Sequence, residues 1–174
     1  MRSQNLRVQN FDLDRVISNG LVDNKLDIIF YETDYRKEKR EFVVVDKETF
    51  KLLARYDYPA AISRFYDHFD SLENYYQNLP DFTDFRLNRQ RGITANGYLL
   101  YWLEMQKNGY QETSELFLIN PLDGTVVHQA SDVSFLDETF RYYAKQKENS
   151  SSPGWEVTDV LNLKPVGESG GYVY

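Results

Sequence analysis

Apolar residues follow strand-like spacing in some segments of the chain and helical spacing in others, and this order of segments occurs twice. Segments rich in β-branched and aromatic residues and bounded by turn residues predict strands at residues 26–33, 42–45, 50–56, 98–106, 112–119 and 125–130. Apolar residues at helical spacing predict a helix after each set of three strands, at residues 59–79 and 134–143. The chain therefore reads as β-β-β-α twice.

Two stretches carry this repeat most clearly, residues 41–57 and 115–131. Each has a β-rich segment, a polar turn and a second strand, and each is followed by a predicted helix. The segment at residues 98–106 is apolar on both faces, which predicts a central strand. Asn108-Gly109 predicts a two-residue hairpin turn.

The layer rules for packing helices on sheets then favour one domain spanning residues 1–174. We expect an α+β fold, in which two β-β-β-α units form one antiparallel sheet of about six strands with the helices packed on it. The parts are a short N-terminal helix at residues 12–18, pseudo-repeat halves at 26–79 and 98–147, an irregular connector at 81–97, and a C-terminal appendage of linker and docked tail at 148–174.

Composition narrows the class of protein. The net charge of −7 argues against binding to a nucleic-acid backbone. The chain has no cysteine, so it forms no disulfide, which fits a reducing compartment. The first ten residues lack the apolar core of a signal peptide, and no apolar run approaches the ~20 residues of a membrane span. We expect a cytoplasmic protein that contacts neither membrane nor nucleic acid.

The negative charge is concentrated in residues 65–85 and 108–140, which contain no Lys or Arg. The first window coincides with the solvent face of the helix predicted at residues 59–79, where acids alternate with tyrosines. Such a surface suits a basic protein partner, and an ordinary solvated helix face is the alternative. The predicted partner-binding residues are Asp67, Asp70, Glu73, Tyr75, Asp81 and Asp84.

Two groups of basic residues are candidate anion sites. Arg86, Arg89 and Arg91 could bind a phosphate or an acidic segment, or they could neutralise neighbouring acids within the fold. The charged run at residues 36–40 is interpreted as a solvated hairpin tip, with an anion-binding patch as the alternative.

The sequence contains no recognisable catalytic, metal-binding or cofactor-binding motif. His68 and His128 have no metal-ligand spacing, and phosphate-loop, dinucleotide and nucleophile-elbow patterns are missing. We therefore expect no cofactor, no metal and no catalytic residue, and we favour a non-enzymatic protein.

Two segments resemble the SUKH superfamily, small α+β proteins that often act in bacteria as immunity partners of secreted toxins. Residues 58–66 are similar to that family's early helix, which opens with a proline and carries an aromatic stripe. Residues 116–127 and 133–140 are similar to its final strands and closing helix. The resemblance spans residues 58–147 and implies an immunity-type role.

These observations predict a non-enzymatic module that binds or neutralises a basic protein partner, with an immunity protein as its specific form. Two alternatives remain open. One is a small-molecule binder or enzyme with a cleft between the halves, lined by Tyr98, Tyr101, Trp102 and the arginine cluster. The other is a structural subunit of a larger assembly.

Overall fold

Antiparallel strands make up most of the described chain. The computed structural model describes residues 20–23, 25–147 and 154–169, which hold twelve strands and one helix. The first sheet contains β1 (Leu21–Asp23), β2 (Ile28–Glu32), β3 (Glu41–Asp46) and β4 (Leu52–Asp57). The second contains β5 (Phe85–Ile93), β6 (Leu99–Lys107), β7 (Tyr110–Ile119) and β8 (Val126–Ser131). The third contains β9 (Val133–Leu136), β10 (Tyr142–Gln146), β11 (Trp155–Asp159) and β12 (Lys164–Ser169), and helix α2 (Ala60–Gln77) joins the first two sheets.

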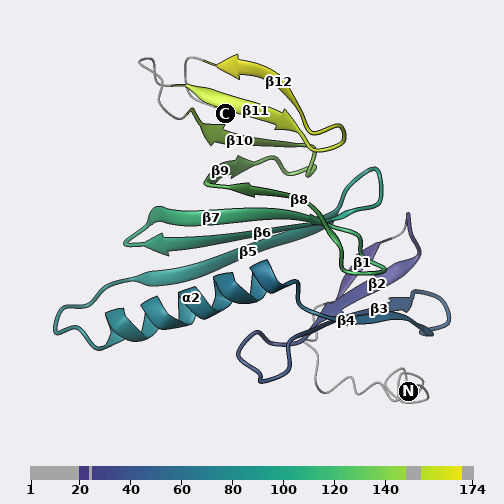
Figure 1. Ribbon diagram of the computed structural model, residues 1–174, viewed down its shortest axis with the longest axis horizontal. Helices are drawn as coiled ribbons and strands as arrows, with labels where there is room; N and C mark the ends of the chain where they lie inside the picture. The colour runs from purple at the N-terminus through teal and green to yellow at the C-terminus, as the bar shows by residue number, and fades with distance from the viewer. Residues whose placement is uncertain (1–19, 24, 148–153, 170–174) are drawn as a thin grey trace.

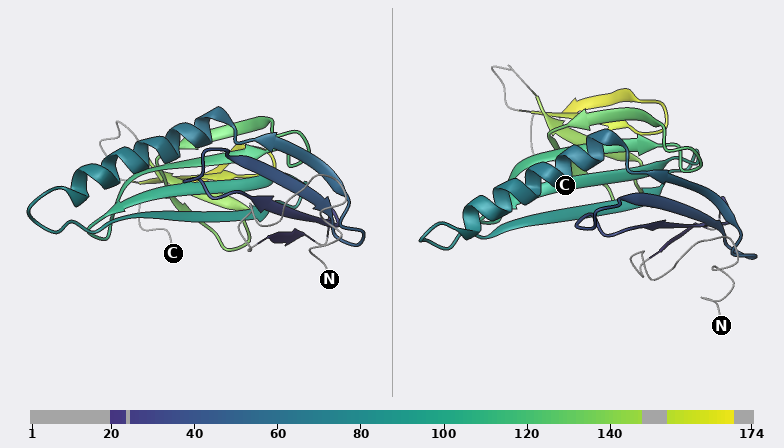
Figure 2. Two further views of the ribbon diagram at one scale, coloured as in Figure 1. Left: turned by 90° about the horizontal axis from the view of Figure 1, so that it is seen from below. Right: turned by 60° about the horizontal axis from the view of Figure 1, so that its bottom comes forward.

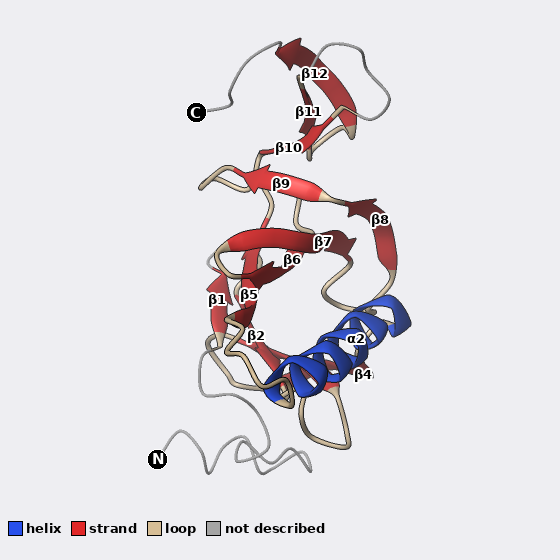
Figure 3. Cartoon of the chain, turned by 90° about the vertical axis from the view of Figure 1, so that its left-hand side faces the viewer, coloured by secondary structure: helices blue, strands red, loops and turns tan. Residues whose placement is uncertain are grey.

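The second sheet is the central layer of the molecule (Figure 1). Helix α2 and the first sheet pack against one of its faces, and the third sheet covers the other (Figure 2). Figure 3 shows this order from the side, with α2 on one side of β5–β7 and β10–β12 on the other. Two separate apolar cores hold the three layers together.

Strand β6 contributes to both cores because its side chains alternate between the two faces of the central sheet. Leu99, Tyr101 and Leu103 enter the core shared with α2, whereas Leu100 and Trp102 enter the core shared with the third sheet. The prediction of a central strand at residues 98–106 is therefore confirmed.

Helix α2 is the predicted helix at residues 59–79. Pro59 occupies the N-cap position, and its fixed φ of −49° suits the entry into a helix. Ile62, Phe65 and Phe69 recur at helical spacing and are buried against the central sheet. Within the described ranges, no helix combines the length and apolar character that crossing a membrane requires.

The predicted α+β fold class is wrong. The described chain is mostly β, with three four-stranded sheets in place of one sheet of about six strands, and the second β-β-β-α unit does not form. The connector predicted at residues 81–97 contains the nine-residue strand β5. The many polar residues of this segment suggested an irregular connector. From Phe85 to Arg91, however, exposed residues alternate with partly buried ones, which is the pattern of a strand with one face in solvent. The short helix predicted at residues 12–18 lies outside the described residues.

Turn chemistry explains why the second predicted helix is missing. Residues 134–143 form most of β9, a turn and the start of β10. The Asp137 carboxylate accepts the backbone N–H groups of Arg141 and Tyr142, both at 2.8 Å, and Phe140 has a φ of 57°. A left-handed residue interrupts a helix, and an aspartate that binds nearby N–H groups stabilises a turn instead.

The sequence repeat is preserved in two hairpin turns. In the β3–β4 turn, the carbonyl of Asp46 accepts the N–H of Phe50, which has a φ of 58°. In the β7–β8 turn, the carbonyl of Asn120 accepts the N–H of Gly124, which has a φ of 79°. The side-chain oxygens of Asp46 and Asn120 also accept the N–H two residues ahead. The repeated unit is thus a hairpin with a defined turn.

The β11–β12 turn has the same geometry. The Asp159 carbonyl accepts the N–H of Leu163, which has a φ of 59°, and its carboxylate accepts the N–H of Leu161. The docked tail predicted after residue 148 is therefore a β-hairpin in its described part, and it pairs with β10.

Candidate ligand-binding groove

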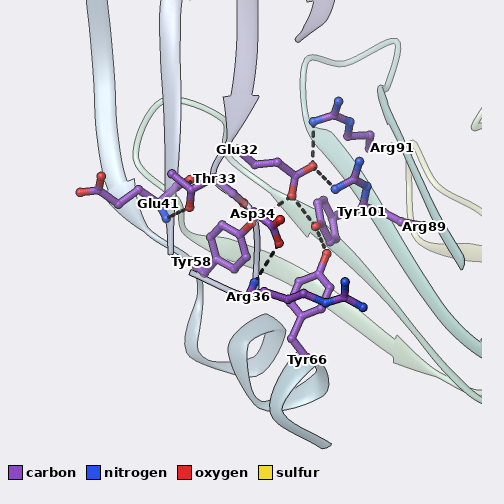
Figure 4. A network of polar contacts seen from close by, with 10 residues as sticks. All are labelled: Glu32, Thr33, Asp34, Arg36, Glu41, Tyr58, Tyr66, Arg89, Arg91 and Tyr101. Atoms are coloured by element: carbon purple, nitrogen blue, oxygen red, sulfur yellow. Dashed lines mark hydrogen bonds and ion pairs between the residues drawn. The ribbon is translucent and has the colours of Figure 1, made fainter. Parts of the chain in front are cut away.

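A buried carboxylate links the first sheet to the central sheet. Glu32 is the last residue of β2, and its side chain is fully buried. Its Oε1 atom lies 2.8 Å from Nη1 of Arg89 and 2.7 Å from Nη1 of Arg91 (Figure 4). Both arginines come from β5, so two ion pairs tie β2 to the edge strand of the central sheet. Removing one partner of a buried ion pair leaves an uncompensated charge, so these pairs stabilise the buried carboxylate.

Tyrosine hydroxyls satisfy the other oxygen of Glu32. Tyr101 donates to Oε2 at 2.6 Å. The hydroxyl of Tyr58 donates to the Thr33 carbonyl and lies 3.3 Å from Oε2. The hydroxyl of Tyr66 lies against that of Tyr101 and extends the network to helix α2 (Figure 4). Burial, and then the charge of Glu32, raise the pKa of Tyr58, Tyr66 and Tyr101 well above the ordinary value. All three hydroxyls therefore keep their protons near neutral pH.

Arg89 keeps its charge for a related reason. Burial has the largest single effect on the pKa of its guanidinium group and would lower it, but the carboxylate of Glu32, together with Tyr101 and Tyr66, raises the pKa above its ordinary value. Its side chain retains 27% exposure, so one side of the guanidinium faces Glu32 while another part reaches the surface. Arg91 is more enclosed, at 11% exposure.

A groove of about 560 Å³ opens beside this network. It lies between the β2–β3 loop, helix α2 and the first half of β5. We name it the arginine groove after Arg36, Arg86 and Arg89, which line it together with aromatic and polar residues: Tyr35, Tyr66, Phe69, Glu73, Phe85, Leu87 and Asn88.

Stacked rings form the apolar wall of the arginine groove. Tyr35 of the β2–β3 loop stacks on Tyr66 of α2, with ring centroids 4.4 Å apart. Phe69 of α2 stacks on Phe85 of β5 at 5.2 Å. The rings therefore connect the three elements that surround the groove, and aromatic stacking of this kind adds to the stability from buried area.

Three arginines line the arginine groove in a protein whose net charge is −7. Each has an acidic partner within the fold: Glu73 for Arg36, Asp84 for Arg86 and Glu32 for Arg89. Arg36 and Arg86 are exposed at 61% and 70%, and Glu73 is the one acid among the described residues that line the groove. Oε2 of Glu73 lies 3.7 Å from Nη2 of Arg36, and this ion pair is partly exposed to solvent. Exposed pairs of this type contribute about 1 kcal/mol or less, so an incoming anion can displace them.

The structure separates the three arginines that the sequence predicted as one anion site. Arg89 and Arg91 point toward Glu32, whereas Arg86 lies on the opposite face of β5 and contacts Asp84 at 2.8 Å. Arg86 and Arg89 line the arginine groove, and Arg91 does not. The proposed alternative, neutralisation of acids within the fold, describes Arg91 best.

Most of the predicted partner-binding residues have partners inside the fold. Arg40 of the β2–β3 loop pairs with Asp67 at 2.8 Å and Asp70 at 3.9 Å. Glu73 pairs with Arg36 and Asp84 with Arg86, as above. Tyr75 remains 59% exposed, and Asp81 is exposed in the loop after α2. The charged run at residues 36–40 thus provides counter-charges for the acidic face of the helix.

The residues predicted to line a cleft between the halves lie on opposite faces of β6. Tyr101 belongs to the Glu32 network, whereas Trp102 and Tyr98 pack in the core under the third sheet. Sequence reasoning missed Glu32 and Tyr35, and it assigned Tyr66 to the acidic, tyrosine-bearing helix face. The alternation of Ile28, Phe30 and Glu32 along β2 was the available signal for a buried acid, because these positions share one face.

Comparison with known proteins adds no relative to this description: no family model matches the chain, and no curated protein matches it.

Proposed function

We propose that this chain is a non-enzymatic binding protein that holds an anionic ligand in the arginine groove. The observation that carries the proposal is the convergence of Arg36, Arg86 and Arg89 on one groove of about 560 Å³. Guanidinium groups bind carboxylates and phosphates through two parallel N–H bonds, so such a group of arginines is suited to these anions. The stacked rings of Tyr35 and Tyr66 offer a flat wall to an apolar part of the ligand.

The titration behaviour of the neighbouring groups supports binding over acid–base catalysis. Glu32 is held by two arginines and two tyrosines. The raised pKa values of Tyr66 and Tyr101 leave these hydroxyls as hydrogen-bond donors near neutral pH. General acid–base catalysis requires a group whose pKa lies near the working pH.

Isothermal titration with citrate, pyrophosphate and a pentaglutamate peptide tests the proposal. We expect at least one of these anions to bind, with an affinity that falls as salt is added. The variant R86E should weaken that binding about tenfold or more, because it replaces an attractive charge with a repulsive one. The matched control K51E makes the same charge change at an exposed position in the β3–β4 turn and should have little effect. Absence of binding, or equal loss in both variants, would contradict the proposal.

A second candidate function keeps the predicted basic protein partner but places it at the end of α2. Phe82 is 92% exposed there, close in sequence to the exposed Tyr75 and Asp81. Exposed aromatic residues beside an acid suit a protein interface. An immunity-type role is the specific form that the SUKH resemblance suggests, and both candidates include the predicted cytoplasmic location.

Co-expression with the product of a neighbouring toxin gene tests this second candidate. We expect a complex that the variants F82A and D81K weaken, whereas R86E leaves it intact. A complex that survives F82A and D81K would contradict the placement at the end of α2.

A further inference from the structure

One edge of the central sheet is formed by β5, whose pairing partner among the described strands is β6. The direction of its backbone groups follows from two hydrogen bonds. Asn108 N–H donates to the Asp84 carbonyl at 2.7 Å, and Thr94 N–H donates to the Tyr98 carbonyl at 2.8 Å. Since the β5–β6 register has no shift, the even-numbered residues of β5 direct their backbone groups toward β6. The odd-numbered residues direct theirs toward the free edge.

The first half of that edge faces the arginine groove. Phe85, Leu87 and Arg89 all line the groove, and their backbone N–H and C=O groups point outward. Within the described residues, no strand pairs with this side of β5. Strand β1 approaches β5, and Leu21 of β1 packs against the same core as Ile93, the last residue of β5. The groove therefore combines three arginine side chains with a short row of backbone donors and acceptors.

We propose that an extended acidic peptide segment of a partner protein binds the arginine groove by adding a strand to the free edge of β5. This inference rests on the proposed function and specifies its ligand. Backbone hydrogen bonds to Phe85, Leu87 and Arg89 supply the ladder, as in other cases of strand addition. A strand spans about 3.4 Å per residue, so residues 85–89 accommodate about five residues of peptide.

The two faces of β5 define the side chains that the peptide presents. On the helix side, the added strand meets Tyr35, Phe69 and the exposed part of Arg89. On the other side it meets Arg86 and Asn88, which are exposed. Side chains of a strand alternate between faces, so the peptide carries acids toward Arg86 and apolar or aromatic residues toward the stacked rings. An alternating acidic and apolar sequence satisfies both sides.

Charge complementarity selects this occupant over a second copy of the chain. In antiparallel pairing of two β5 edges, a two-fold axis at Arg89 would place Arg89 opposite its own copy, and an axis at Gln90 would place Arg89 opposite Arg91. Like charges directly opposite one another destabilise a strand pair. Arginine at an exposed edge also discourages indiscriminate pairing, while it attracts a strand of the opposite charge.

Fluorescence anisotropy with three labelled heptapeptides tests the inference. The first alternates Glu with Phe and Leu, the second is the same peptide methylated at the amide nitrogens that would face β5, and the third replaces each Glu with Lys. We expect the first to bind and the methylated peptide to bind about tenfold more weakly or worse, because the ladder donors are removed. The Lys peptide should not bind. R86E should weaken binding of the first peptide, whereas K51E should not.

Hydrogen exchange provides an independent readout of strand addition. The acidic peptide should slow exchange of the Phe85, Leu87 and Arg89 amides by about tenfold or more, because they acquire hydrogen-bond partners. Citrate at saturation should leave these amides unchanged.

The outcomes separate the two proposals. If citrate or pyrophosphate binds through Arg86 but the methylated peptide binds as tightly as the unmodified one, strand addition is wrong and the anion-binding function stands. If no anion and no acidic peptide binds, both proposals are wrong. A concentration-dependent dimer whose contact protects residues 85–89 would replace the peptide with a second copy and also overturn the inference.

Discussion

Replacing Glu32 with Gln should destabilise the protein more than any other single change of a carboxylate to its amide. Glu32 is fully buried and faces Arg89 and Arg91 at 2.8 and 2.7 Å. The variant E32Q keeps the shape of the side chain but removes the negative charge that faces both guanidinium groups. Removing one partner of a buried ion pair typically costs about 3–5 kcal/mol. Arg89 is 27% exposed and can recover some hydration, so we expect the lower end of this range, about 3 kcal/mol.

Glu104 offers a matched control on the central sheet. It is also buried, at 7% exposure, but its carboxylate accepts hydrogen bonds from the amides of Asn88, Gln106 and Gln111, at 3.1, 2.7 and 2.6 Å. The change E104Q removes a buried charge and one acceptor oxygen, and it leaves no cation unpaired in this group. We expect a change of about 1 kcal/mol or less in the free energy of unfolding.

Urea denaturation followed by tryptophan fluorescence measures both variants. The midpoint should shift strongly for E32Q and little for E104Q, with an unchanged dependence on urea concentration for both. Equal losses in the two variants would show that desolvation of the carboxylates, and not the pairing with arginine, governs their contribution. A loss below about 1 kcal/mol for E32Q would contradict the argument from the buried ion pairs.

Three further predictions concern the turns and the pH dependence. Leu163 is 40% exposed with a φ of 59°, so L163G should raise the free energy of unfolding by about 0.5–1 kcal/mol in a thermal melt, and a lower melting temperature would contradict this. Gly124 and Gly109 both have positive φ, but a Cβ atom at Gly124 would lie 2.5 Å from the Tyr56 ring and one at Gly109 would meet nothing within 4 Å. Urea denaturation should therefore show that G124A costs about 2 kcal/mol or more and G109A about 1, and equal costs would contradict the contact with Tyr56. Burial lowers the pKa of His128 below 6.5, so the unfolded chain takes up its proton first and stability should fall as the pH drops from about 7.5 to about 5.5. Denaturation across this pH range should show that the free energy of unfolding changes less with pH in H128Q than in the unchanged protein. An equal change would exclude His128 as the source of the pH dependence.

Sequence reasoning predicted the elements that have a long apolar pattern within one stretch of the chain. The stripe of Ile62, Phe65 and Phe69 predicted α2, and the both-sided apolar pattern of residues 98–106 predicted the central strand. The second helix was predicted from a shorter stripe that includes Leu136 and Phe140. Leu136 ends β9, and Phe140 lies in the turn that follows, with a left-handed φ of 57°. The helical spacing of these residues therefore does not come from a helix. A short stripe cannot distinguish one helix from two strands, because both place apolar residues inward.

Turn chemistry is local, and its first residue, an Asp or Asn, is visible in the sequence. An Asp or Asn followed four residues later by a left-handed residue opens the turns at Asp46, Asn120 and Asp159. Reading Asp159 in this way predicts the β11–β12 hairpin, which sequence reasoning described only as a docked tail. The left-handed residues of these three turns differ in type, however. Glycine commonly adopts a positive φ, so Gly124 indicates its turn, whereas Phe50 and Leu163 are residue types that rarely do so.

The candidate site was not predicted because it depends on contacts between residues that lie far apart in the sequence. Glu32 and Arg91 are 59 residues apart, and neither residue alone identifies the other. One physical constraint nevertheless links them, since a carboxylate on the inward face of a strand needs a cation or several hydrogen-bond donors in the same core. Glu32 follows Ile28 and Phe30 on that face, and Arg89 follows Phe85 and Leu87 on the matching face of β5. Once β5 is recognised as a strand, the inward acid and the inward arginines require each other, and their pairing places the exposed Arg86 on the opposite face of the same edge strand.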